Sequence, residues 1–183
     1  MYGDMSIVQA GTGPEVRIGL FGTAGHSTWR QRFIDAYVAT GTLYYTPQVA
    51  VGTWDPSMAD VEAENLAGNR VLVFALTGET YGTATMAEIG IAATSVKGTD
   101  RHLLVYVELN IAFDKVVDPE VVGDDENVRA LLTQIVRNHE NARALLIAHL
   151  GKLNLPNVTL CTSLDAMLQE SLRLARELEN QLV

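Results

Sequence analysis

The sequence has a single cysteine, Cys161, among its 183 residues, and its four histidines are scattered along the chain. One cysteine excludes a disulfide framework, and the spacing of the histidines disfavours a zinc site. Because Cys161 falls in a predicted strand, the pattern favours a buried and inert thiol. We therefore expect neither a metal ion nor any other cofactor.

Positive charge is also scarce. The sequence has 13 Lys and Arg against 22 Asp and Glu, so its net charge is −9, and it contains no basic cluster. Such a chain is a poor candidate for binding nucleic-acid polymers, which requires basic patches. No apolar run approaches the roughly 20 residues that span a bilayer, and the Gly-rich N-terminus does not resemble a signal peptide. We expect a cytoplasmic protein without a membrane partner.

Apolar strands and helices alternate along the chain, and 48% of its residues are hydrophobic. The alternation, repeated five times, predicts an α/β fold with a doubly wound, parallel, five-stranded sheet and helices on both faces. Residues 1–14 are expected to be a flexible N-terminal segment and residues 15–183 a single domain. The predicted strands are 16–21, 43–45, 71–76, 103–107 and 157–161, and the predicted helices are 27–39, 56–67, one from about 85, 127–150 and 163–181, with a long loop at 110–125.

The most informative segment is the apolar strand 71–76 with the polar loop and the small-residue helix that follow it. We expect this helix to begin near Thr85 and to carry Glu88 in its first turn. In an open α/β sheet, ligands bind outside the carboxyl ends of the strands, where Glu88 would lie. Thr85 and Glu88 also match the S/T-x-x-E capping box, in which the glutamate only satisfies a backbone amide. Gly82 and Thr83 leave space around the carboxylate.

The loop after the first strand contains Gly22 and Thr23 and leads into a helix with Ser27 as its expected N-cap. Small residues at this position let backbone N–H groups approach an anion at the helix N-terminus. A tight turn that requires glycine explains the same pattern. Trp29 and Arg30 could contact a base or a phosphate, and Trp29 could equally pack in the core.

The loop after the second strand offers an amide, Gln48, and an indole, Trp54. An exposed tryptophan in a loop suits stacking on an aromatic ring, although Trp54 could instead close the edge of the core. The next helix carries Glu62 on the side of its apolar residues and Glu64 on a different side. A solvated acidic face is the alternative for both.

Four elements within residues 18–93 resemble the nucleoside 2-deoxyribosyltransferase superfamily, in particular its deoxyribosyltransferase-like branch. They are the strand end Leu20-Phe21-Gly22-Thr23, the segment Tyr45-Thr46-Pro47-Gln48 with Trp54, the helix with Glu62 and Glu64, and Gly82-x-x-x-Met86-Ala87-Glu88-Ile89-Gly90. The last element resembles the family's G-x-x-x-E-[IL]-G signature and is the most specific of the four. The resemblance implies a flavodoxin-like sheet.

The resemblance also implies a reaction, cleavage or transfer at the N-glycosidic bond of nucleosides or nucleoside monophosphates. Glu88 takes the place of the nucleophile that attacks C1′, and Glu62 or Glu64 that of an acid that assists the leaving base. An adjacent carboxylate stabilises the oxocarbenium character that develops at C1′. Gly82 stands where the transferases usually carry an aspartate, and Leu20 where they carry an aromatic residue.

The remaining positions implied by the resemblance are substrate contacts. Thr23, Thr83 and Thr85 are expected to contact the sugar or phosphate, and Phe21, which is adjacent to Leu20, belongs to the same expected site. Sites in this family are often completed by a neighbouring subunit, so we expect a homo-oligomer, with Asn110 as a candidate contribution.

Two other readings stay open. The first is a nucleotide-binding module on the same scaffold that does not cleave its ligand. The second is a partner-binding domain that uses the acidic loop Asp124-Asp125-Glu126 and the long helix after it. We expect Glu88, Glu62 and Glu64, Trp54 and the Gly22-Thr23 turn to open onto the same cleft, which favours the enzyme.

Overall fold

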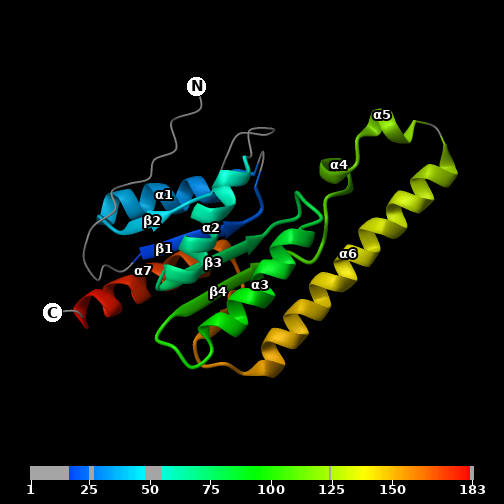
Figure 1. The fold of residues 1–183 in the computed structure, drawn as a ribbon. Coiled ribbons are helices and arrows are strands. Elements are labelled where there is room, and N and C mark those ends of the chain that lie inside the picture. Colours follow the sequence, from blue (N-terminus) through cyan, green and yellow to red (C-terminus); the bar gives the residue numbers. More distant parts are fainter. Residues whose placement is uncertain (1–16, 25–26, 48–54, 124, 182–183) are drawn as a thin grey trace.

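A computed structural model of the chain describes residues 17–24, 27–47, 55–123 and 125–181. The expected flexible segment at residues 1–14 lies outside the described residues. Five parallel strands form one sheet in the order β2-β1-β3-β4-β5 (Figure 1). This is the strand order of flavodoxin-like folds, and it confirms the predicted α/β class. The strands are β1 (Arg17–Gly22), β2 (Leu43–Tyr45), β3 (Val71–Leu76), β4 (His102–Val107) and β5 (Val158–Leu160).

Helices cover both faces of the sheet, as the alternating pattern predicts (Figure 1). Helices α1 and α7 pack on one face, and α2, α3 and the C-terminal part of α6 pack on the other. The helices are α1 (Trp29–Thr40), α2 (Pro56–Gly68), α3 (Thr83–Val96), α4 (Phe113–Val116), α5 (Pro119–Val122), α6 (Glu126–Leu153) and α7 (Leu164–Asn180).

Strand β3 lies at the centre of the sheet, and all six of its residues are buried. Its side chains alternate between two cores because successive residues of a strand point to opposite faces. Val71, Val73 and Ala75 face the core beneath α1 and α7, whereas Leu72 and Phe74 face the core beneath α3. Burial on both faces explains why the strand is a continuous apolar run rather than an alternating one.

Three local expectations are wrong. Helix α3 begins at Thr83 rather than Thr85, with Gly82 as its N-cap. The N-cap of α1 is Thr28 and not Ser27, and Thr28 makes no side-chain capping bond. The expected loop at 110–125 contains the two four-residue helices α4 and α5, which are too short to give a periodic pattern in the sequence.

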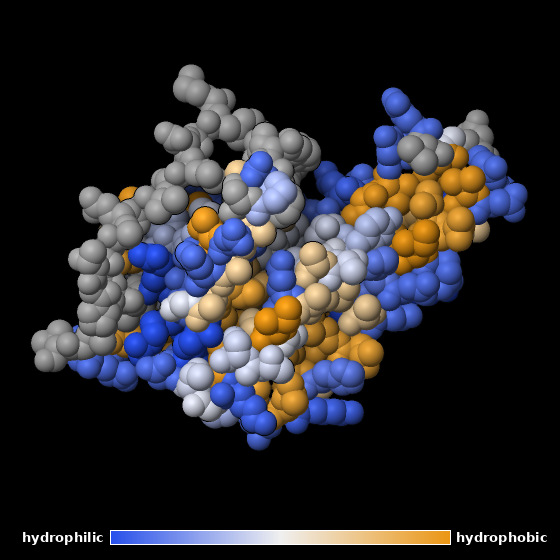
Figure 2. All heavy atoms as spheres, in the orientation of Figure 1, coloured by the Kyte–Doolittle hydropathy of each residue, from blue (hydrophilic) through white to orange (hydrophobic). Residues whose placement is uncertain are grey.

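The C-terminal part of the long helix α6 packs on the sheet, where Leu146 and Leu150 enter the core beneath α3. In the view of Figure 1 its N-terminal part extends with α5 beyond the other elements. Figure 2 shows apolar side chains gathered on this part of the surface, and Leu131 is 62% exposed. No helix among the described residues is both long and apolar enough to cross a membrane.

Candidate functional site

The carboxyl ends of β1 and β3 form the point of the sheet at which the strand order reverses, where doubly wound folds bind ligands. Gly22, the last residue of β1, pairs with Ala75 of β3 and has φ +113°. A Cβ atom at Gly22 would lie 2.2 Å from the carbonyl oxygen of Ala75. Glycine is therefore required here by the close approach of β1 and β3 as well as by its positive φ, rather than by the space that a ligand would need.

Thr23 continues this contact between the two loops. Its backbone N–H donates to the Ala75 carbonyl at 2.9 Å, and its hydroxyl accepts a 2.9 Å hydrogen bond from the backbone N–H of Thr77. The residue is only 2% exposed. Thr23 thus joins the β1–α1 loop to the β3–α3 loop, and one lone pair of its hydroxyl is already used.

Trp29 and Arg30 both lie in the interior instead of facing a ligand. The Trp29 indole N–H donates to the Thr23 carbonyl at 2.9 Å, and its ring contacts Phe33, which supports the packing alternative. Arg30 is 0% exposed and donates to the carbonyls of Leu20, Gly22 and Thr23. The expectation that Arg30 contacts a base or phosphate is wrong because its donors are directed at the end of β1.

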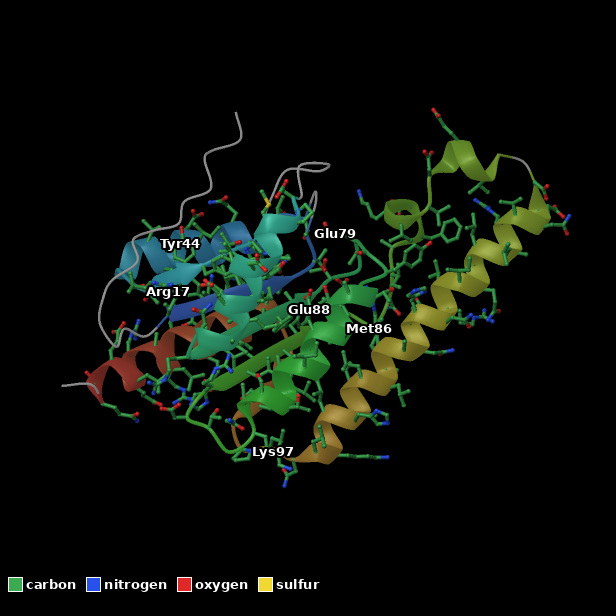
Figure 3. The ribbon with its side chains drawn as sticks, viewed as in Figure 1. Arg17, Tyr44, Glu79, Met86, Glu88 and Lys97 are labelled. Carbon is green, nitrogen blue, oxygen red and sulfur yellow. The ribbon has the colours of Figure 1, made fainter. Side chains whose placement is uncertain are left out.

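Glu88 lies in the second turn of α3, six residues after the N-cap Gly82. The capping-box alternative is therefore wrong, since it would require Thr85 as the N-cap and Glu88 in the first turn. Gly82 has φ +71°, and a Cβ atom there would lie 2.1 Å from Leu76 Cδ1. Figure 3 shows Glu88 on the side of α3 nearer α2, and Met86 on the side nearer α6.

Glu62 of α2 and Glu88 of α3 interact electrostatically with the buried Arg30, and the charge of Glu62 also acts on Glu88. Burial raises the pKa of the Glu88 carboxyl, the negative charge of Glu62 raises it further, and Arg30 opposes both. Burial likewise raises the pKa of Glu62, and Arg30 again opposes the rise. Among the described residues, neither carboxylate has a hydrogen bond or an ion pair. Two half-buried carboxyl groups with raised pKa values are therefore free to act on a ligand.

Tyr45, at the end of β2, belongs to the same electrostatic cluster. Burial and the charge of Glu62 raise its pKa to about 12, so its phenol stays neutral and can donate a hydrogen bond. Its ring lies against Phe21, which in turn stacks on Phe74. Phe21 is 1% exposed and contributes to the core, where it offers no surface to a substrate.

The two acids of α2 are distinguished by their surroundings. Glu64 is exposed, whereas Glu62 is partly buried and interacts with Arg30, Tyr45 and Glu88. Of the two glutamates that the sequence left open, Glu62 is the one whose charge acts on Glu88. Gln48 and Trp54 lie outside the described residues.

The expected contacts on α3 and after β4 lie in different surroundings. Thr83 is exposed, and its hydroxyl is 3.3 Å from Nε2 of His139 on α6. Thr85 is buried in the first turn of α3. Asn110 is exposed after β4, and its carbonyl oxygen lies against Gly78 of the β3–α3 loop. The structure therefore keeps Thr83 and Asn110 at the surface near this loop and removes Thr85 from it.

Arg143 of α6 is a residue of this edge that the sequence reasoning missed. Its fully buried guanidinium donates to the carbonyls of Thr77, Thr80 and Glu108, the first of these at 3.0 Å. Arg143 thereby fixes the β3–α3 loop against the end of β4. It is spaced three and seven residues before Leu146 and Leu150, so a basic residue on the apolar side of the helix was the available signal.

Within the described residues, two hydroxyl groups at this edge are buried and have no hydrogen-bond partner, Ser27 Oγ after β1 and Thr46 Oγ1 after β2. Buried polar groups in native proteins are usually satisfied, so these two are places for polar groups of a ligand or for water. Within the described residues, no group of three or more His, Cys, Asp or Glu side chains is arranged to hold a metal ion.

Comparison with known proteins adds no family to this geometry. A scan against models of protein families gives no match, and a search of curated proteins gives none either.

Proposed function

We propose that the protein cleaves or transfers the glycosyl group at the N-glycosidic bond of nucleosides or nucleoside monophosphates. The observation that carries the proposal is the pair of half-buried carboxyl groups, Glu62 and Glu88, at the switch point of the sheet. Burial raises the pKa of both carboxyl groups, and the charge of Glu62 raises that of Glu88 further. Two carboxyl groups in different surroundings are typical of glycosidic chemistry, in which one group must be ionised and the other protonated.

In the proposed reaction the carboxylate of Glu88 attacks C1′, and a bond forms between its oxygen and that carbon. The C1′–N bond breaks, its electron pair passes to the base nitrogen, and Glu62 supplies the proton that neutralises the base. Water or a second base then attacks C1′ and releases Glu88, while Glu62 recovers a proton from that nucleophile. The neutral phenol of Tyr45 is available to donate to Glu62 or to the base.

The ligand class follows from three features of the edge. The unpartnered hydroxyls of Ser27 and Thr46 suit the hydroxyl groups of a sugar. The negative net charge disfavours a polymer of phosphates but permits a single nucleoside or nucleotide. The resemblance of the Glu88 segment to the deoxyribosyltransferase signature supports the same class.

The test is incubation with a panel of ribo- and deoxyribonucleosides and their 5′-monophosphates, followed by chromatography for free base. Addition of a second base separates transfer from hydrolysis. We expect Glu88→Gln to abolish base release without loss of folding, and Glu64→Gln, an exposed change with the same loss of charge, to leave it intact. Full turnover by Glu88→Gln would refute the proposal. Saturable binding without any free base would instead establish the nucleotide-binding module.

The proposal includes a homo-oligomer in the cytoplasm. Leu131, Leu145 and Leu153 of α6 are each more than half exposed, and an interface between copies would bury such side chains. Sedimentation velocity over a range of protein concentrations tests the oligomer, and a monomer at every concentration would exclude it.

A further inference from the structure

The outward side of α3 carries no charged side chain. The only charged residue of this helix is Glu88, which is half-buried on the side nearer α2. The exposed residues of α3 are small, apolar or polar without charge, namely Thr83, Ala84, Ala87, Gly90, Ile91, Thr94 and Ser95. The largest of them, Ile91, is 59% exposed.

The neighbouring stretch of α6, residues 138–151, has the same character. Its two charged residues are withdrawn from the surface, because Arg143 is fully buried and the half-buried carboxylate of Glu140 accepts a 3.0 Å hydrogen bond from the Ile111 N–H. The exposed residues of the stretch are Asn138, Asn141, Ala144, Leu145, Ala148, His149 and Gly151. None of these is Asp, Glu, Lys or Arg, and Leu145 is 56% exposed.

The two stretches adjoin, and their exposed residues form one surface, the α3–α6 face. Ile89 of α3 and Leu146 of α6 belong to the same core beneath the two helices, and the Thr83 hydroxyl lies 3.3 Å from His139 Nε2. In Figure 2 the atoms over α3 and toward α6 are mostly white to orange rather than blue.

The absence of charge on this face is unusual for a surface in water. A soluble surface typically has about 25 to 35% charged residues, so the fourteen exposed positions would carry roughly four charges. They carry none, in a chain with 13 Lys and Arg and 22 Asp and Glu. Depletion of charged residues is characteristic of the centre of a protein–protein interface.

A second copy of this chain is the occupant that an uncharged face fits best. A partner of opposite charge would be selected by a charged face, because interfaces have complementary potentials. In a two-fold contact the same surface meets itself, so any charge near the axis would face its like. Each copy has a net charge of −9, and an uncharged face lets two such copies meet without opposing acids across the contact.

The size of the surface agrees with a dimer. Helix α3 has 14 residues and α6 has 28, so at 1.5 Å per residue they are about 21 and 42 Å long. A strip about 10 Å wide along both helices covers roughly 600 Å² per copy. The total of about 1,200 Å² reaches the lower limit of specific, stable interfaces.

We propose that the α3–α6 face is the interface of a two-fold homodimer, in which α3 and α6 of one copy pack against α3 and α6 of the other. The inference rests on the homo-oligomer of the proposed function and assigns its surface. It places the helix that carries Glu88 at the contact between the two copies.

The test is sedimentation velocity over a range of protein concentrations, with one charge introduced on the face. We expect the natural chain to be a dimer. Ile91→Glu and Leu145→Glu replace exposed side chains, so far-UV circular dichroism should show the natural fold for both. Each variant should dimerise at least about 100-fold more weakly, because a symmetric interface would bury the new charge twice.

Val38→Glu is the matched control, because Val38 is 65% exposed on α1, which packs on the opposite face of the sheet. This variant should remain a dimer. Ala87→Glu covers the case in which Ile91→Glu or Leu145→Glu does not fold, since glutamate is a good helix former at an exposed position. It should dissociate the dimer in the same way.

The inference is wrong if the natural chain is a monomer at every concentration, or if its dimer survives both Ile91→Glu and Leu145→Glu. Sedimentation requires no substrate, so the result is independent of the reaction. A dimer that responds as expected, in a protein that releases no base, would refute the reaction and establish the interface. Base release by a natural chain that is monomeric would refute the interface and support the reaction.

Discussion

Gly82 is the N-cap of α3, the helix that carries Glu88. The variant Gly82→Ala is expected to destabilise the fold substantially. Its φ of +71° lies in the left-handed region, which costs an alanine about 1 to 2 kcal/mol. The new Cβ atom would also lie 2.1 Å from Cδ1 of the fully buried Leu76. Forcing an extra carbon into a packed core typically costs about 1 to 3 kcal/mol. The sum, about 3 kcal/mol, is a large share of the roughly 5 to 15 kcal/mol that stabilise a domain.

The matched control is Gly90→Ala, eight residues further along the same segment. Gly90 is inside α3, and a Cβ atom there would have no other atom within 4 Å. Alanine is favoured over glycine in a helix interior by about 0.8 to 1 kcal/mol, so this variant should be stabilised. The same change from glycine to alanine is therefore expected to lower the stability of the protein at Gly82 and to raise it at Gly90.

Urea unfolding followed by far-UV circular dichroism gives the free energy of each variant, provided that the slope m stays constant. In thermal unfolding the loss for Gly82→Ala corresponds to roughly 6 to 12 °C for a chain of this size. Leu76→Val should reduce the cost of Gly82→Ala, because it removes the colliding Cδ1, and the double-mutant cycle measures that coupling. Equal stability of Gly82→Ala and the natural protein, or additive effects in the cycle, would refute the reasoning.

Three further predictions concern the same edge of the sheet. Gly22→Ala should cost about 3 kcal/mol or more in urea unfolding, because its Cβ atom would meet the rigid carbonyl of Ala75 rather than a movable side chain. Arg143→Met should cost roughly 3 kcal/mol by leaving buried carbonyls without donors, and hydrogen exchange should accelerate in the β3–α3 loop, whereas unchanged exchange would contradict this role. For Glu88 the folded-state pKa is raised, so the stability that it contributes is present below its unfolded pKa, near 4.3, and is lost as the pH rises through the folded pKa. Glu88→Gln should therefore be more stable than the natural protein at pH 8 and equal to it below about pH 4, as measured by thermal unfolding across that range.

The fold could be predicted because its strongest signals are local. A strand of six apolar residues, Val71–Leu76, is buried on both sides only at the centre of a sheet that helices cover on both faces. The structure places it there. Regular alternation of strands and helices then leaves a parallel sheet as the simplest arrangement. The short helices α4 and α5 escaped prediction because four residues contain little more than one helical turn and cannot show a period.

The start of α3 was missed for a different reason. Thr85 and Glu88 have the spacing of a capping box, and this local pattern favoured a start at Thr85. The structure uses Gly82 instead, whose left-handed conformation ends the loop and starts the helix two residues earlier. The consequence for the site is direct, because a glutamate in the second turn is released from capping.

The two buried arginines could not be assigned from sequence, because their partners are backbone carbonyls that carry no residue signature. Arg30 precedes Phe33 and Tyr37 by three and seven residues, as Arg143 precedes Leu146 and Leu150, so both lie on the apolar side of a helix. A basic residue at such a position indicates a buried cation, but the sequence alone does not name its acceptors.

The shared position of these arginines explains how an acidic protein supports a pair of half-buried glutamates. The last carbonyls of parallel strands have no partner in the sheet, and they accumulate at the same edge as the acids. Arg30 binds those of β1, and Arg143 binds those of the β3–α3 loop and of β4. Neutral donors would satisfy these carbonyls equally well. A cation also lowers the cost of ionising a half-buried carboxyl nearby, and among the described residues it is Arg30, not Arg143, whose charge lowers the pKa values of Glu62 and Glu88. We therefore expect loss of the charge at Arg30 to alter the titration of Glu62 and Glu88. Loss of the charge at Arg143 should alter only the β3–α3 loop.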